Sequence, residues 1–159
     1  MSVHISFARE IPNLGMNQSA SLVKKAVQWV LEEEQITEDC ALSVLFTDDE
    51  GIRRINREFR EIDRATDVLS FPMNELIPEH FDASLCERDP ETGEILLGDM
   101  VISIPRCVAQ GEEFGHGYDR ELCYLTVHSI LHLLGYDHVD EGPMKKQMRS
   151  KEKKIMGDT

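Results

Sequence analysis

The chain has 159 residues, of which 41% are hydrophobic and 30% charged, and its formal net charge is −13. This length suits one domain, residues 1–159, with a single buried core, and the negative charge argues against nucleic-acid binding by the whole surface, because a polyanion would be repelled. The sequence shows no signal-peptide pattern and no apolar run long enough to span a bilayer, and its four cysteines form no C-x-x-C pair. We therefore expect a cytoplasmic protein without a disulfide framework or membrane contact.

The first part of the chain alternates strand and helix patterns. Residues 3–7 alternate apolar and polar side chains, which is typical of a strand with one buried face. Apolar residues at helical spacing predict a helix over 17–34, and an apolar run predicts a second strand over 41–46. Asp48 can then cap a helix that has Arg60 near its end.

The middle of the chain carries two strand patterns separated by an acidic segment. Residues 67–71 are β-branched and aromatic and are stopped by Pro72, which favours a strand near a sheet edge. Residues 74–94 are polar, strongly acidic and contain two prolines, so we expect an irregular, mobile insertion loop. Strand character resumes over 95–104, where Gly98 suggests a bulge or a close backbone approach.

Three further helices are expected, over residues 105–114, 119–134 and 143–156. Four strands and five helices give an α/β or α+β sandwich, and the pattern leaves the order of the strands open. We adopt the α+β class, with a mixed sheet of about four strands packed against about five helices.

The most specific motif is HSILHLLGYDH, which spaces three histidines as H-x-x-x-H-x-x-G-x-x-H. Residues four apart share one face of a helix, so His128 and His132 can direct ring nitrogens at one point. A left-handed Gly135 would end the helix and let His138 return as a third ligand. Three protein ligands with an open position are typical of catalytic zinc, and imidazole also suits nickel, copper and iron.

The same spacing matches the metzincin protease signature at all positions but one. Ser129 stands where those proteases carry their general-base Glu. The helix is therefore zincin-like, and a metzincin-like peptidase is the least favoured of the functions considered.

Three motifs together resemble the YbeY family of single-strand-specific endoribonucleases, which are ribosomal RNA maturation factors. They are INREFREIDRATDVLSFP (55–72), LLGDMVIS (96–103) and HSILHLLGYDH (128–138). The resemblance implies that His128, His132 and His138 bind zinc and that Arg60 is the functional arginine. It also implies cleavage of single-stranded RNA in 16S rRNA 3' end processing and ribosome quality control. The small ribosomal subunit or a ribosomal protein is then the expected partner, and DNA is not expected.

These roles make chemical sense. A metal held by three histidines can lower the pKa of bound water to about 7. The Arg60 guanidinium could hold a phosphate through bidentate hydrogen bonds and stabilise the charge that grows during attack. The alternative that stays open is a ribosome-assembly factor without catalytic activity, in which the metal is structural.

Three residues in these motifs depart from the usual family pattern and bear on the expected activity. Relative to the usual family pattern, Ser129 and Glu61 replace common glycines and Ala65 replaces a common proline. Glu61 could weaken phosphate attraction beside Arg60 through like-charge repulsion.

Three polar residues are candidates for a supporting role at the site. Asp137 could orient an imidazole or simply form the turn after the helix. Thr66 and Asp67 could support the site or cap the following strand.

Overall fold

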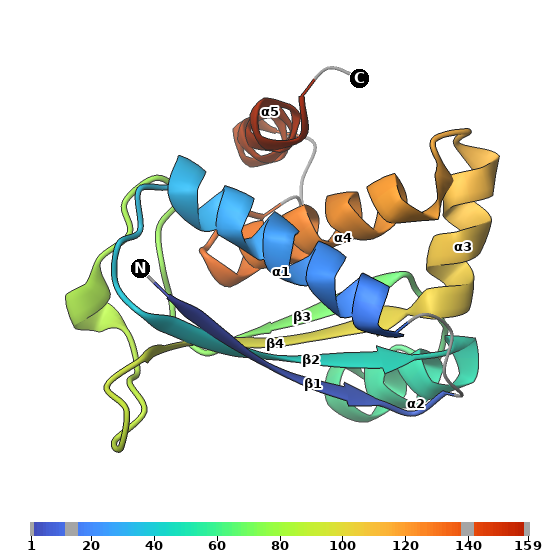
Figure 1. The fold of residues 1–159 in the computed structure, drawn as a ribbon, viewed down its shortest axis with the longest axis horizontal. Helices are drawn as coiled ribbons and strands as arrows, with labels where there is room; N and C mark the ends of the chain where they lie inside the picture. The colour runs from blue at the N-terminus through green and yellow to red at the C-terminus, as the bar shows by residue number, and fades with distance from the viewer. Residues whose placement is uncertain (1, 12–15, 138–141, 158–159) are drawn as a thin grey trace.

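The computed structural model describes residues 2–11, 16–137 and 142–157 (Figure 1). It contains a four-stranded sheet, five α-helices and one short 3-10 turn, Ala83–Leu85, within these residues. The elements in chain order are β1 (Val3–Arg9), α1 (Met16–Glu33), β2 (Cys40–Thr47), α2 (Asp49–Arg60), β3 (Val68–Pro72), β4 (Ile95–Ser103), α3 (Ile104–Glu113), α4 (Gly117–Leu133) and α5 (Pro143–Met156). The predicted α+β class is confirmed, and each predicted element is present with ends displaced by a few residues.

The sheet has the order β1-β2-β4-β3. The first three of these strands are parallel neighbours, and β3 pairs antiparallel with β4. The sheet is therefore mixed, and β3 lies at an edge, as Pro72 at its end predicted. Because β3 follows α2 directly, the end of α2 and the edge strand lie close together.

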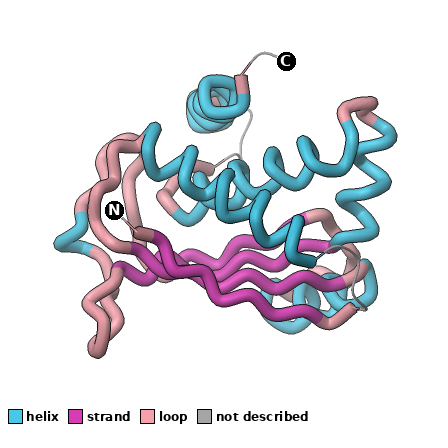
Figure 2. The backbone as a smooth tube through the Cα atoms, in the orientation of Figure 1, coloured by secondary structure: helices cyan, strands magenta, loops and turns pink. Residues whose placement is uncertain are grey.

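Helices cover the two faces of the sheet unequally (Figures 1 and 2). The main core lies between the sheet and the layer formed by α1 and α4, and α5 packs on the outer side of that layer. On the opposite face, α2 covers a second and smaller cluster centred on Ile52, Leu69 and Val101. No helix in the described part of the chain is long and apolar enough to cross a membrane.

The structure contains both irregularities that the position of Gly98 in the sequence suggested. The pairing of β2 with β4 shifts register between Leu96 and Gly98, which is a β-bulge. Gly98 also has a φ of +136°, and a Cβ atom there would collide with the carbonyl oxygen of Phe71. The backbone of edge strand β3 can therefore approach β4 only because residue 98 has no side chain.

The acidic segment over 74–94 is irregular, as predicted, but it is attached to the sheet. The Asn74 side-chain amide donates to the Leu96 carbonyl at 2.9 Å, and its oxygen accepts from the Glu87 backbone amide at 2.8 Å. The first residues of the segment, Asn74 to Leu76, lie beside the end of α4.

Candidate active site

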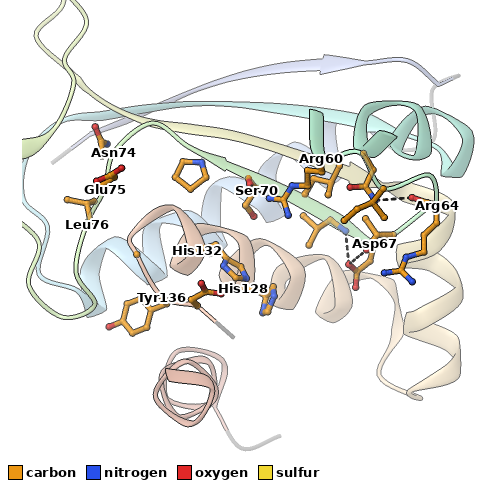
Figure 3. A pocket seen from close by; sticks show the side chains of 18 residues that line it. Arg60, Arg64, Asp67, Ser70, Asn74, Glu75, Leu76, His128, His132 and Tyr136 are labelled. Atoms are coloured by element: carbon orange, nitrogen blue, oxygen red, sulfur yellow. Dashed lines mark hydrogen bonds between the residues drawn. The ribbon is translucent and has the colours of Figure 1, made fainter. Parts of the chain in front are cut away.

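A cleft of about 850 Å³ opens where α4, β3, the end of α2 and the start of the acidic segment meet (Figure 3). Several residues selected from the sequence line it: Arg60, Thr66, Asp67, His128, His132 and Asp137. They come from three regions of the chain, so the fold brings together the motifs that the sequence presents separately.

Two of the three predicted metal ligands, His128 and His132, lie on the cleft side of α4, which is otherwise mostly buried. The ring centroids of His128 and His132 are 4.8 Å apart, and the rings meet edge to face at 79°. Figure 3 shows both rings facing the side of the cleft that carries Arg60 and Ser70. One turn of helix thus aligns the two imidazoles as the i, i+4 spacing predicted.

The third predicted ligand, His138, lies outside the described residues. Within the parts of the chain that the structure does describe, no three His, Cys, Asp or Glu side chains form a group that could hold a metal. Of the three predicted ligands, the structure describes His128 and His132. Their imidazole chemistry suits zinc and related divalent metals.

Gly135 ends the ligand helix in the way its position predicted. Its φ is +103°, and its amide donates to the His132 carbonyl at 3.1 Å. A Cβ atom at this position would collide with the carbonyl group of Leu76. Glycine therefore serves the turn and also lets the acidic segment close one end of the cleft.

Arg60 is the last residue of α2 and is fixed by the edge strand. Its Nη2 donates to the Ser70 carbonyl at 2.7 Å, and its guanidinium carbon lies 5.4 Å from the centre of the Phe71 ring. Helix α2 starts at the predicted cap, since the Asp48 carboxylate accepts from the Gly51 amide at 2.8 Å. The residue after the helix, Glu61, caps it with a left-handed backbone conformation, φ 60° and ψ 28°.

Arg60 differs electrostatically from its basic neighbours on α2. Arg53 and Arg57 lie 2.8 and 4.0 Å from Asp63, and Arg54 lies 2.9 Å from Glu10. Among the residues that the structure describes, no carboxylate forms such an ion pair with Arg60. Its positive charge is thus directed at the cleft without an acidic partner in the described structure.

Ser129 does not extend into the cleft. Its hydroxyl is fully buried and lies 2.7 Å from the hydroxyl of Ser70 on β3. Position 129 therefore supplies neither a peptidase-type base nor a polar group that lines the cleft. Its role in this structure is to join α4 to β3.

The supporting residues have mixed roles. Asp67 accepts from the Val68 amide at 2.7 Å and from Thr66 Oγ1 at 3.4 Å, which are local capping contacts at the start of β3. Its other oxygen accepts from Gln110 at 3.4 Å. Asp137 lines the cleft, and its proposed effect on an imidazole stays a prediction.

Sequence reasoning missed Glu152, on α5. This carboxylate is 5% exposed, and Oε2 lies 2.5 Å from Nδ1 of His128 while Oε1 accepts from the Tyr124 hydroxyl at 3.2 Å. One signal was available in the sequence, because Glu152 shares a helical stripe with the apolar residues Met148 and Ile155. A carboxylate on a buried stripe needs a partner.

The fold and the cleft define a class of protein: an α+β protein in which an arginine at an edge strand faces a histidine pair on a buried helix. The family model described as "Endoribonuclease YbeY" matches residues 4–159, and the chain belongs to this family. The resemblance seen in the sequence motifs is thereby confirmed.

Curated relatives agree with this membership. A Clostridium kluyveri protein named "Endoribonuclease YbeY" is 46% identical over 142 residues, covering 85% of each chain. A Clostridium perfringens protein of the same name is 46% identical over 145 residues, covering 85% of this chain and 83% of its own. The solution structure of a Thermotoga maritima protein shares the fold, with a TM-score of 0.56 and 24% identity over 95% of this chain and 88% of that chain.

Proposed function

We propose that this protein is an endoribonuclease that cleaves single-stranded RNA in the cleft between α4 and β3. The observation that carries the proposal is the placement of Arg60, His128 and His132 around one cavity. Membership of the endoribonuclease YbeY family supports the same reaction.

His128 and His132 would hold a zinc ion there, with His138 as the third ligand, and nickel or another divalent metal would also suit this donor set. The described histidines fit this role because their rings line the same cavity with centroids 4.8 Å apart. When bound, such a metal supplies a water molecule of lowered pKa.

Arg60 binds the phosphodiester in this proposal. During hydrolysis the water oxygen bonds to phosphorus, one P–O ester bond breaks, and negative charge grows on the phosphoryl oxygens. The Arg60 guanidinium has five N–H donors, and one of them is held by the Ser70 carbonyl at 2.7 Å. The remaining donors can contact the phosphoryl oxygens from a fixed position, which stabilises that charge.

The family resemblance further suggests the substrate and the setting. We propose that the RNA is ribosomal, with action at the 3' end of 16S rRNA and in ribosome quality control in the cytoplasm. The small ribosomal subunit or one of its proteins would then be the partner. Narrow recognition fits the charge distribution, because the net charge is −13 and Arg53, Arg54 and Arg57 are ion-paired.

Cleavage of a fluorescent single-stranded RNA by the zinc-loaded protein, beside a duplex of the same sequence, tests this function. Arg60→Ala should lower kcat/KM by about 100- to 1000-fold without loss of zinc. His132→Ala should lose both zinc and cleavage. Arg54→Ala is the matched control, because Arg54 lies on the same helix, pairs with Glu10 and lies outside the cleft. Equal cleavage by all preparations would identify a contaminating nuclease and refute the proposal.

A ribosome-assembly factor with a structural metal is the second candidate. The ion pairs of Arg53, Arg54 and Arg57 favour it, because paired side chains are less available to hold RNA. In that case chelation of the metal would lower the melting temperature, and the parent protein would bind its ribosomal partner without cleaving RNA.

A further inference from the structure

We infer that Glu152 is a positioning residue for His128, an inference that rests on the metal site of the proposed function. The relevant contact joins Glu152 Oε2 on α5 to Nδ1 of His128 on α4 at 2.5 Å. The carboxylate is 5% exposed, so water competes little for this contact. Asp137, the residue that the sequence suggested for such a role, is thus joined by a second and buried candidate.

Both carboxylate oxygens of Glu152 contact residues of α4. Oε1 accepts from the Tyr124 hydroxyl at 3.2 Å, and Tyr124 lies one turn before His128 on α4. In this contact the phenol hydroxyl donates and the carboxylate oxygen accepts. The carboxylate is therefore held at two points, which fixes its orientation toward the imidazole.

The chemistry of the two groups determines which imidazole nitrogen would bind a metal. In the inferred arrangement, Nδ1 of His128 donates its N–H to the Glu152 carboxylate oxygen. Nε2 is then the nitrogen through which His128 would bind. Carboxylates that accept from a metal-bound histidine fix the ring orientation and raise the basicity of the ligand.

Helix α5 is anchored so that Glu152 keeps this position. Met148, one turn earlier, is 1% exposed and packs in the main core. The neighbouring residue, Lys151, lies 3.6 Å from Glu34, directly after α1, and 3.4 Å from Glu79 in the acidic segment. Packing and ion pairs thus place α5 against the ligand helix independently of any metal.

Zinc affinity of the full-length protein, measured by competition with a chromophoric chelator, tests the inference without using activity. Glu152→Ala should weaken zinc binding by about 10- to 100-fold. It should also alter the visible absorption spectrum of the cobalt-substituted protein, because the His128 ring is no longer held in one orientation. Glu152→Gln should give a smaller loss, since its amide oxygen can still accept from Nδ1 but carries no charge.

Glu121→Gln is the matched control. Glu121 is 1% exposed and lies on α4, as His128 does. It pairs with another histidine, His116, at 2.6 Å, but neither residue lines the cleft. Removing its charge should change thermal stability while zinc affinity and the cobalt spectrum stay as in the parent.

The outcomes separate the inference from the function on which it rests. Tight zinc binding by the parent together with unchanged binding and spectra in both Glu152 variants would overturn the inference alone. An equal loss in Glu121→Gln would show a general packing effect and would also overturn it. Absence of zinc binding by the parent would overturn the metal site and the inference together. If Glu152→Ala fails to fold, the nearly isosteric Glu152→Gln decides the result.

Discussion

The hydroxyls of Ser70 and Ser129 lie 2.7 Å apart in the buried interior and connect the two halves of the cleft. The backbone carbonyl of Ser70 accepts from Arg60, and Ser129 directly follows His128 on α4. This pair of serines therefore links the element that orients the arginine to the helix that carries the histidines. A displacement of β3 from α4 would alter the distance between Arg60 and the histidine pair.

Ser129→Ala should lower the free energy of unfolding by about 1–3 kcal/mol, because the Ser70 hydroxyl would remain buried without this partner. The double variant Ser70→Ala/Ser129→Ala should lose less than the sum of the single variants, since it removes both polar groups together. Urea unfolding of the four proteins gives the coupling energy. Strictly additive losses would show that the two hydroxyls do not stabilise each other.

Glu61→Gly should stabilise the protein. Glu61 ends α2 in the left-handed region, with its amide directed at the carbonyls of Arg57 and Asn56. A non-glycine residue in this conformation is strained by roughly 1–2 kcal/mol, and part of this gain is offset by the greater freedom of glycine in the unfolded chain. An increase of about 1 kcal/mol in the unfolding free energy is expected. A loss of stability would mean that the Glu61 side chain makes contacts that outweigh the strain.

Local signals in the sequence predicted the elements and several of their ends. Asp48 as a cap, Pro72 at an edge strand, Gly98 at a bulge and Gly135 at a helix end each depend on one residue and its immediate neighbours. Such features follow from backbone chemistry that a single residue determines.

Contacts between distant segments could not be predicted in the same way. Ser70 and Ser129 are 59 positions apart, and His128 and Glu152 are 24 positions apart. These pairs depend on the order of the strands and on the packing of α5. Neither can be predicted from the spacing of residues within one segment. The family motifs indicated which residues gather at the site, but they did not indicate which atoms meet.

Gly135→Ala should destabilise the protein more than Gly93→Ala. Both glycines have positive φ, +103° and +76°, but only Gly135 has backbone atoms of Leu76 where a Cβ would lie. Strain of about 1–3 kcal/mol is expected from the backbone conformation, and the collision at Gly135 adds to it. Thermal unfolding and zinc binding of both variants provide the comparison. Equal losses would show that the acidic segment can move away from α4 without cost.

The buried thiols predict a defined response to pH. Burial raises the pKa of Cys40 and Cys107 from 9.0 to about 12. Because the thiolate is the reactive form, iodoacetamide at pH 8 should modify the half-buried Cys86 before these two, as mass spectrometry can establish. Early modification of Cys107 would contradict its burial.

The same shifts make the fold sensitive to alkali. A folded pKa above the unfolded value means that the unfolded chain loses the proton first as the pH rises. The stabilisation from Cys40 and Cys107 is thus complete below about pH 9 and is lost progressively toward pH 12. Urea midpoints should fall over this range, and Cys107→Ala should show a smaller fall than the parent. An equal fall would assign the alkaline loss to other groups.

Phe71→Leu tests how firmly Arg60 must be held. The guanidinium carbon lies 5.4 Å from the Phe71 ring centre, and a cation–π contact of this kind contributes about 0.5–1 kcal/mol. If the proposed function is correct, kcat/KM for single-stranded RNA should fall about two- to fivefold, as the lost contact energy converts to rate. Phe59→Leu is the matched control. Phe59 is 70% exposed and its ring centroid lies 5.9 Å from that of Phe71, but the Arg60 guanidinium lies over the Phe71 ring. An unchanged rate in Phe71→Leu, with folding verified by circular dichroism, would mean that the Ser70 carbonyl alone keeps Arg60 in place.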